Sequence, residues 1–275
     1  MSTVLDPAAL ARELFDAREA GQPVAVAPTA RGDGFDLAAA YAVEAELTRM
    51  RRQAGHATVG RKVGYANKAM WRVLKLPTLV WASMYDDTVH YTGTTSPASL
   101  AMAGLRSPRI EPEIVIKLKT APPSGEAGAV IGAAEWVALG FEIVDCPYPE
   151  WKFQPADFVA SFGLHAALFV GEPRPVGAEA LDVLCDQLAA LKILLKKNGE
   201  LVEEGFGRNA LRSPALCVGE LASALAAQPG QEPLRAGELV STGTLTNAHP
   251  IAAGDQWTVE AEGIDLPGVT LRVTD

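Results

Sequence analysis

The sequence predicts an α+β fold in which a helical N-terminal part, reaching to about Leu79, packs on a β-rich body. Two capped segments with helical spacing of apolar residues precede residue 56. From Thr58 onward, short alternating or apolar segments are separated by Gly and Pro, which is typical of strands. The 275 residues are 48% hydrophobic, enough to bury a full core. We expect a helical subdomain over 1–79, including the first strand, and a β-rich domain over 80–275.

The first two helices are predicted from their ends. Asp6 can cap a helix that has Pro7 at its first position and Gly21 just past its end. Asp36 precedes an Ala-rich segment that ends at Gly55 with basic residues in its last turns. Both segments are therefore expected to be helical.

The β-rich part begins with "TVGRKVG", which starts at Thr58 and alternates, followed by a short helix that stops before Pro77. "RIEPEIVIKLK" and "WVALGFEIVDC" have strand length and apolar character, and "DQWTVEAEG" and "GVTLRV" predict two late strands. "KILLKKNGELVEEG" predicts a hairpin with a turn at Asn198-Gly199, although "EALDVLCDQLAALKILLKK" is also compatible with one long helix. "SPALCVGELASALAAQ" has helical spacing.

Composition excludes several classes of protein. A net charge of −9 without clustered Lys and Arg argues against a nucleic-acid partner. No apolar run is long enough to span a bilayer and the first residues do not resemble a signal peptide, so we expect a cytoplasmic protein with no membrane partner. Cys146, Cys185 and Cys217 are far apart and odd in number, which indicates reduced thiols. A small molecule is the expected partner.

Familiar catalytic motifs are missing from the sequence. It has no glycine-rich phosphate loop, no nucleophile elbow and no dinucleotide fingerprint. Its four histidines are never at helical ligand spacing, which excludes a helical zinc pair. The acidic residues are the better candidates.

Glu111 and Glu113 flank Pro112 at the start of "RIEPEIVIKLKT". Residues i and i+2 of a strand share a face, so the two carboxylates project together. Pro112 cannot donate a ladder hydrogen bond and is expected at a strand start, an edge or a bulge. An ordinary half-exposed edge strand would have the same pattern, so this segment alone does not decide between the two interpretations.

Glu142 lies in the apolar run "VALGFEIVDC", where a buried carboxylate needs a partner. If it converged with Glu111 and Glu113, each pair of charges at about 4 Å would repel by roughly 4 kcal/mol, and a divalent cation would be required. Oxygen ligands favour Mg²⁺ or Mn²⁺. The alternative is an ion pair with Arg or Lys.

Two further segments carry candidate polar groups. Lys62 has only Gly60 and Gly64 as neighbours on its strand face, so it could meet an anion or move a proton, with burial lowering its pKa. It could equally be a surface lysine. "LVSTGTLT" gathers hydroxyls around a glycine, which suits a carboxylate but also an ordinary turn.

In their order along the chain, these residues resemble the fumarylacetoacetate hydrolase superfamily, and within it the 2-keto-4-pentenoate hydratase and 4-oxalocrotonate decarboxylase branch. The resemblance covers most of the chain, through "GRKVGYANKAMWRVL", "RIEPEIVIKL", "GFEIVDCPYPEW", "DFVASFGLHAALFVG" and "LVSTGTLTNAHPIAAGD". It implies a mixed β-sandwich roll with a helical N-terminal part, assembled into homo-oligomers. It also implies a site with the following residues: Glu111, Glu113 and Glu142 as ligands of Mg²⁺ or Mn²⁺, Lys62 and Glu142 as catalytic residues, and Lys62, Ser241 and Thr244 as substrate-binding residues.

The resemblance implies a metal-dependent hydratase that adds water to a 2-hydroxy-2,4-dienoate or 2-oxo-4-enoate in catabolism of aromatic compounds. One alternative is a 4-oxalocrotonate-type decarboxylase, for which Arg61, Arg72 or Arg208 would hold the distal carboxylate. Another is an acylpyruvate hydrolase using His56 or His90, and the last is a non-catalytic binding protein. Pro147 follows Cys146 where hydratases of this branch tend to carry arginine, which leaves the substrate open.

Overall fold

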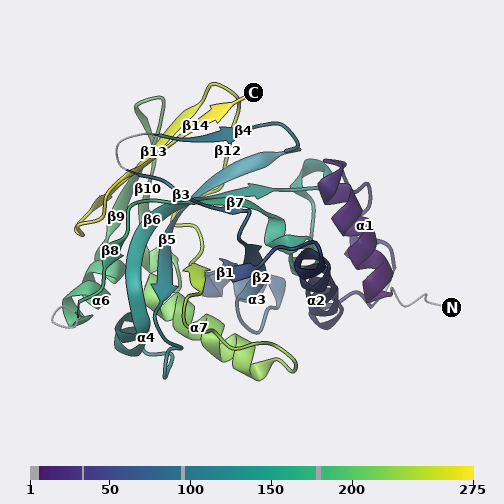
Figure 1. The fold of residues 1–275 in the computed structure, drawn as a ribbon, viewed down its shortest axis with the longest axis horizontal. Helices are drawn as coiled ribbons and strands as arrows, with labels where there is room; N and C mark the ends of the chain where they lie inside the picture. The colour runs from purple at the N-terminus through teal and green to yellow at the C-terminus, as the bar shows by residue number, and fades with distance from the viewer. Residues whose placement is uncertain (1–5, 33, 94–96, 178–180) are drawn as a thin grey trace.

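A computed structural model of the chain describes residues 6–32, 34–93, 97–177 and 181–275, and Figure 1 shows their arrangement. A nine-stranded mixed sheet forms the body, and a five-stranded sheet lies beside it. The larger sheet runs in the order β2 (Val80–Tyr85), β1 (Thr58–Gly64), β11 (Leu239–Ser241), β5 (Pro108–Leu118), β6 (Ala134–Asp145), β7 (His165–Val170) and β3 (Val89–Tyr91), with β12 (His249–Pro250) on β5 and β8 (Arg174–Pro175) on β6. The smaller sheet runs β10 (Glu200–Phe206), β9 (Lys192–Lys197), β13 (Gln256–Glu262), β14 (Val269–Thr274) and β4 (Ala98–Ala101). The predicted α+β roll is confirmed.

The two N-terminal helices begin where their caps predict. In α1 (Pro7–Glu19) the Asp6 carboxylate accepts a hydrogen bond from the Ala8 amide, and in α2 (Leu37–Gln53) Asp36 accepts from Ala39. These helices lie side by side at one end of the molecule (Figure 1). The other helices are α3 (Lys68–Leu74), α4 (Ala127–Ala133), α5 (Pro155–Ala160), α6 (Leu181–Ala190) and α7 (Pro214–Ala227), with short 3₁₀ turns η1 (Pro28–Ala30), η2 (Pro149–Trp151), η3 (Phe162–Leu164) and η5 (Gly207–Asn209).

The predicted hairpin is formed by β9 and β10. Asn198 and Gly199 both adopt positive φ in its turn, at 53° and 87°. The alternative of one continuous helix is wrong, because α6 ends at Ala190 and the chain then continues as strand; residues 179 and 180 of that alternative lie outside the described residues.

The strand that carries the paired glutamates is central in the sheet. Side chains on both faces of β5 are buried, including Val115 beside the glutamates and Ile114 opposite, so the half-exposed edge strand is wrong. Pro112 is the fifth residue of β5, not its start. Proline is tolerated there because β11 and β12 pair with other residues of β5, so no strand needs the missing N–H group of Pro112. The turn after β11 lies beside Pro112, and the Pro112 carbonyl accepts a hydrogen bond from the Leu245 amide. The ladder therefore loses no partner at this position.

The first strand, β1, is part of the main sheet. It pairs antiparallel with β2 and parallel with β11, which places Lys62 beside Ser241. The domain boundary near residue 79 stays a prediction. In the part of the chain that the structure describes, no helix combines the length and apolar character needed to cross a bilayer.

Candidate metal-dependent active site

Three glutamate carboxylates converge at the middle of the large sheet. The antiparallel register of β5 and β6 places Glu111 directly opposite Glu142, and Glu113 lies two residues further along the same face of β5. One oxygen from each of the three carboxylates lies within 4.8 Å of the others. Glu113 and Glu142 are completely buried, whereas Glu111 is half-buried. This oxygen-only donor set matches the preference of a hard divalent cation.

Glu113 is held by the small-residue turn after β11. Its Oε2 accepts a hydrogen bond from the Ser241 hydroxyl at 2.5 Å and from the Gly243 amide at 2.8 Å. Its other oxygen, Oε1, is buried and has no hydrogen-bond partner among the described residues. Leaving a buried carboxylate oxygen unpartnered is costly, so Oε1 of Glu113 is a candidate ligand atom.

The protonation of the cluster reflects its crowding. Burial raises the pKa of Glu113 well above its usual range, and repulsion by Glu142 and Glu111 adds to the effect. Burial, followed by the Glu142 charge, raises the pKa of Glu111 to about 7 against the opposing attraction of Lys62. A divalent cation among these oxygens would favour their ionised forms, so the residues fit such an ion.

Glu142 differs from the other two glutamates because it has cationic and hydrogen-bonding partners. Lys62 Nζ lies 3.0 Å from its Oε2, and His165 Nδ1 lies 2.8 Å from its Oε1. Burial favours the neutral acid, but the Lys62 ammonium and the His165 hydrogen bond together hold the pKa of Glu142 below its ordinary value. The ion pair expected as an alternative to a metal site is thus present within the same cluster.

Lys62 is one of the most buried charged side chains, at 1% exposure. Its ammonium donates to the Gly163 carbonyl at 3.0 Å and stands 4.7 Å from the Phe158 ring centroid. The expectation of a lowered pKa is wrong. Burial does act in that direction, but the charges of Glu142, Glu111 and Glu113 outweigh it and raise the pKa of Lys62. The ammonium is therefore the stable form beside these carboxylates.

Two glycines make room for this lysine. A Cβ on Gly64 would lie 2.5 Å from the Phe158 ring, so only glycine lets the ring stand beside the ammonium. In η3, Phe162, Gly163 and Leu164 all have φ between 55° and 60°, in the left-handed region. A Cβ on Gly163 would lie 2.7 Å from Lys62 Cδ. The left-handed turn, with glycine at its centre, thus brings the Gly163 carbonyl within hydrogen-bond distance of the ammonium.

His165 is the functional candidate that the sequence did not reveal. It is buried at the start of β7, with Nε2 3.0 Å from the Thr88 hydroxyl. Burial lowers the pKa of His165, and an ionised Glu142 can only accept, so the neutral ring donates from Nδ1 and accepts at Nε2. Its backbone carbonyl accepts from the half-buried Arg18 of α1 at 2.6 Å. The one sequence signal was a histidine in the apolar segment "LHAALFV".

A cavity of about 510 Å³ opens at Lys62 and Glu111. Of the three predicted substrate-binding residues, Lys62 and Thr244 line it. Ser241 is not among the lining residues and donates its hydroxyl to Glu113 instead. His56 and His90 are elsewhere: His56 faces Asp86 and Asp87, and the His90 ring packs against the Phe169 ring in a tilted arrangement. Neither histidine lines the cavity.

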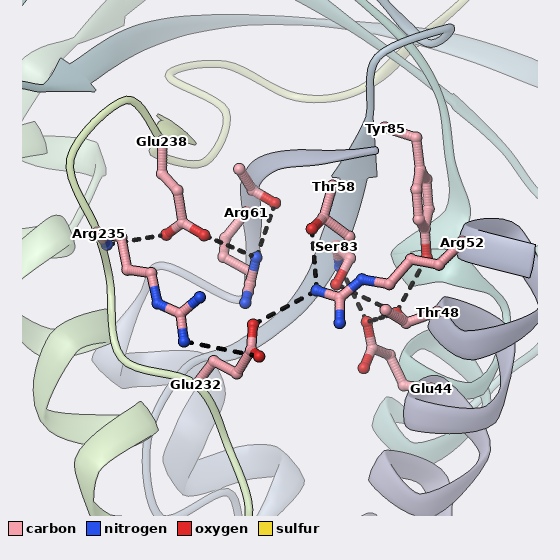
Figure 2. A network of polar contacts seen from close by, with 11 residues as sticks. Glu44, Thr48, Arg52, Thr58, Arg61, Ser83, Tyr85, Glu232, Arg235 and Glu238 are labelled. Atoms are coloured by element: carbon pink, nitrogen blue, oxygen red, sulfur yellow. Dashed lines mark hydrogen bonds and ion pairs between the residues drawn. The ribbon is translucent and has the colours of Figure 1, made fainter. Parts of the chain in front are cut away.

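The three arginines proposed to bind a distal carboxylate do not line this cavity either. Arg61 lies on the opposite face of β1 from Lys62, where its guanidinium is 3.4 Å from the Glu238 carboxylate and accompanies a surface network of Arg52, Glu232 and Arg235 (Figure 2). Arg72 is exposed on α3, and Arg208 lies over the Phe206 ring at 4.1 Å.

Known proteins are similar to this chain over most of its length. No model of a protein family matches the chain. A 2-hydroxyhexa-2,4-dienoate hydratase from Comamonas testosteroni is 32% identical over 227 residues, 82% of each chain. The chain belongs to the hydratase and decarboxylase branch of the fumarylacetoacetate hydrolase superfamily.

Further members of this branch agree with that assignment. A 4-oxalocrotonate decarboxylase from Pseudomonas sp. (strain CF600) is 31% identical over 83% of each chain. The solved structure of 4-oxalocrotonate decarboxylase from Pseudomonas putida G7, complexed with magnesium and adipate, matches 98% of this chain and 99% of its own with a TM-score of 0.84 and 29% identity. The predicted resemblance to this superfamily is confirmed.

Proposed function

We propose that the protein is a divalent-metal-dependent hydratase that adds water to a 2-hydroxy-2,4-dienoate or its 2-oxo-enoate form. The observation that carries this proposal is the convergence of Glu111, Glu113 and Glu142 beside a buried ammonium that lines a cavity. One buried oxygen of Glu113 has no partner among the residues that the structure describes. The hydratase relatives support the same reaction. The substrate is a small acid, and no feature of the charge distribution suits a nucleic acid.

The three glutamates would hold Mg²⁺ or Mn²⁺. When bound, such an ion supplies Lewis-acid stabilisation of the negative charge that develops on the substrate's 2-oxygen. Ser241 and the Gly243 amide orient Glu113, and His165 orients Glu142, so the donor oxygens are fixed before substrate arrives.

Lys62 is the proposed proton carrier and anion holder. Its ammonium is fixed by Gly163 and Glu142 at the inner end of the cavity, where the substrate's carboxylate or 2-oxygen would lie. When its glutamate neighbours ligate a cation, they stabilise the ammonium less, and the pKa of Lys62 falls from its raised value. That change would make proton transfer to or from the substrate easier.

Hydration places a hydroxyl group on C4 of the dienoate, while C3 and C5 each gain a hydrogen and the enol oxygen loses its proton. The net change is one added water. Thr244 on the cavity wall offers a hydroxyl near this chain of carbons, and we propose it as a substrate-binding residue. Ser241 would act through Glu113 instead.

Decarboxylation of a 4-oxalocrotonate-like diacid is the second candidate, because decarboxylases are among the relatives. It would use the same triad and lysine. Acylpyruvate hydrolysis has less support, since His56 and His90 lie away from the cavity. From the superfamily resemblance we also infer homo-oligomers and a cytoplasmic location.

The test is to follow the ultraviolet absorbance of 2-hydroxypenta-2,4-dienoate and of 4-oxalocrotonate with the protein, with and without a chelator. Metal-dependent loss of the dienoate absorbance, with 4-hydroxy-2-oxopentanoate as product, is the expected result. Turnover of 4-oxalocrotonate alone would favour the decarboxylase. Failure of Mg²⁺ and Mn²⁺ to raise the melting temperature would favour a non-catalytic protein.

A further inference from the structure

The outer part of the cavity is uncharged over most of its wall. Beyond Lys62 and Glu111, aromatic and apolar side chains include Tyr65, Met70 and Trp151. The remaining polar wall consists largely of amides and hydroxyls. Such a surface suits the uncharged end of a substrate whose oxo-acid end lies at Lys62.

One charged side chain interrupts this neutral wall. Glu203 of β10 lines the cavity, and its carboxylate is fixed by three partners. The backbone amide of Asn247 donates to it at 3.2 Å, the Asn247 side chain donates at 3.0 Å, and His249 Nε2 lies 2.6 Å away. Glu203 is therefore held in place as an acidic group on the cavity wall, on a different strand from Lys62.

Lys62 is the one basic side chain among the described residues that line the cavity. Lys68, Arg208 and Arg212 line a separate hollow, which shares Ala66 and other residues with the cavity wall. All three cations are exposed to solvent. Inside the cavity, a second carboxylate on the substrate would be exposed to the like charge of Glu203, whereas these three cations line the neighbouring hollow.

We propose that the site selects 2-oxo acids with a single carboxylate and an uncharged tail, an inference that rests on the proposed function. Glu203 is the specificity-determining residue, because its charge disfavours a second carboxylate on the substrate. Like charges a few ångströms apart in a partly buried site repel strongly enough to change affinity by about tenfold or more. The apolar wall supplies the matching attraction for a hydrocarbon tail. The site would therefore favour a monocarboxylic dienoate over 4-oxalocrotonate.

Two unreactive probes isolate this selection from catalysis. 2-Oxohexanoate and 2-oxoadipate have the same number of carbons and the same oxo-acid end, and differ in a terminal methyl or carboxylate. Calorimetric titration into the full chain with Mg²⁺ present is expected to show 2-oxohexanoate binding at least about tenfold more tightly. In Glu203→Gln, which keeps an oxygen acceptor for Asn247, 2-oxoadipate should gain about tenfold while 2-oxohexanoate changes little.

Glu204→Gln is the matched control. Glu204 is the next residue of β10, points to the other face and pairs with Lys192 at 2.6 Å, so the same change of charge there should leave the preference intact. Arg208→Gln should also leave it intact. A melting curve for each variant establishes that it is folded.

Equal or tighter binding of 2-oxoadipate by the wild type would overturn the proposal, as would an unchanged preference in Glu203→Gln. A loss of 2-oxoadipate binding in Arg208→Gln would assign the second carboxylate to the outer cations and overturn it as well. These outcomes are independent of turnover. Selective binding without hydration of any dienoate would refute the hydratase function and leave the selection at Glu203 standing.

Discussion

Two glutamates of the cluster should respond differently to replacement by glutamine: one substitution should destabilise the metal-free protein strongly, and the other should change its stability little. In Glu142→Gln the carboxylate that neutralises Lys62 at 3.0 Å is removed, and the ammonium stays buried with 1% exposure. Removing one partner of a buried ion pair typically costs about 3–5 kcal/mol. Glu111 and Glu113 still attract the ammonium, so the lower end, about 3 kcal/mol, is the better expectation.

Glu113→Gln should behave differently. The raised pKa of Glu113 shows that burial and its carboxylate neighbours disfavour its charge. A glutamine oxygen can still accept from Ser241 and Gly243, while its amide group can donate toward the other carboxylates. We therefore expect a change in unfolding free energy within about 1 kcal/mol, in either direction.

Thermal unfolding in a chelating buffer measures both variants. At about 2–4 °C per kcal/mol for a chain of this size, Glu142→Gln should melt roughly 6–12 °C below wild type, and Glu113→Gln within a few degrees. Added Mn²⁺ should raise the melting temperature of the wild type and of neither variant. Equal melting temperatures for the two variants without metal would refute the assignment of Glu142 as the counter-ion of Lys62.

Four other outcomes test the site. Lys62→Ala should lower turnover at least about a hundredfold while the protein still binds Mn²⁺, measured by steady-state kinetics and metal titration; unchanged kinetics would remove the lysine from the mechanism. Gly163→Ala places a Cβ 2.7 Å from Lys62 Cδ at a φ of 60°, and should cost about 2–4 kcal/mol in denaturant unfolding together with most of the activity. His165→Ala should weaken Mn²⁺ binding by about 10–100-fold and move its pH midpoint upward, because Glu142 loses a hydrogen bond that favours its ionised form. The folded protein raises the pKa of Glu111 from 4.5 to about 7, so protonated Glu111 stabilises the metal-free fold fully below pH 4.5, and this stabilisation should decline as the pH rises to about 7. The measurement is the melting temperature in chelator across this pH range, compared with that of Glu111→Gln. A wild-type melting temperature that does not fall relative to the variant would contradict the raised pKa.

Local sequence signals predicted the first two helices and the hairpin because the responsible interactions are short in range. Asp6 and Asp36 cap their own helices, and Asn198-Gly199 adopts the positive φ angles that its turn requires. The sharing of one strand face by Glu111 and Glu113 likewise follows from strand geometry alone.

What the sequence could not predict depends on partners distant along the chain. Pro112 could lie in a central strand because the turn after β11 fills a gap beside it. The pKa of Lys62 is raised because the carboxylate of Glu142, from another strand, lies 3.0 Å from its ammonium. The sequence around Lys62 does not indicate that the two strands bring these side chains together. His165 belongs to the site because β6 and β7 pair and bring its ring to the Glu142 carboxylate.

The pairing of β1 with β11 has a consequence for biosynthesis. Lys62 and Ser241 are neighbours across this parallel pair, although 178 positions separate them, and Ser241 and Gly243 hold Glu113 from the same turn. During translation the carboxylate cluster therefore lacks its last supports until this late segment has left the ribosome. For the cation site proposed above, we therefore expect a chain that lacks this segment to bind Mn²⁺ more weakly than the complete chain, so that cation affinity would report completed folding.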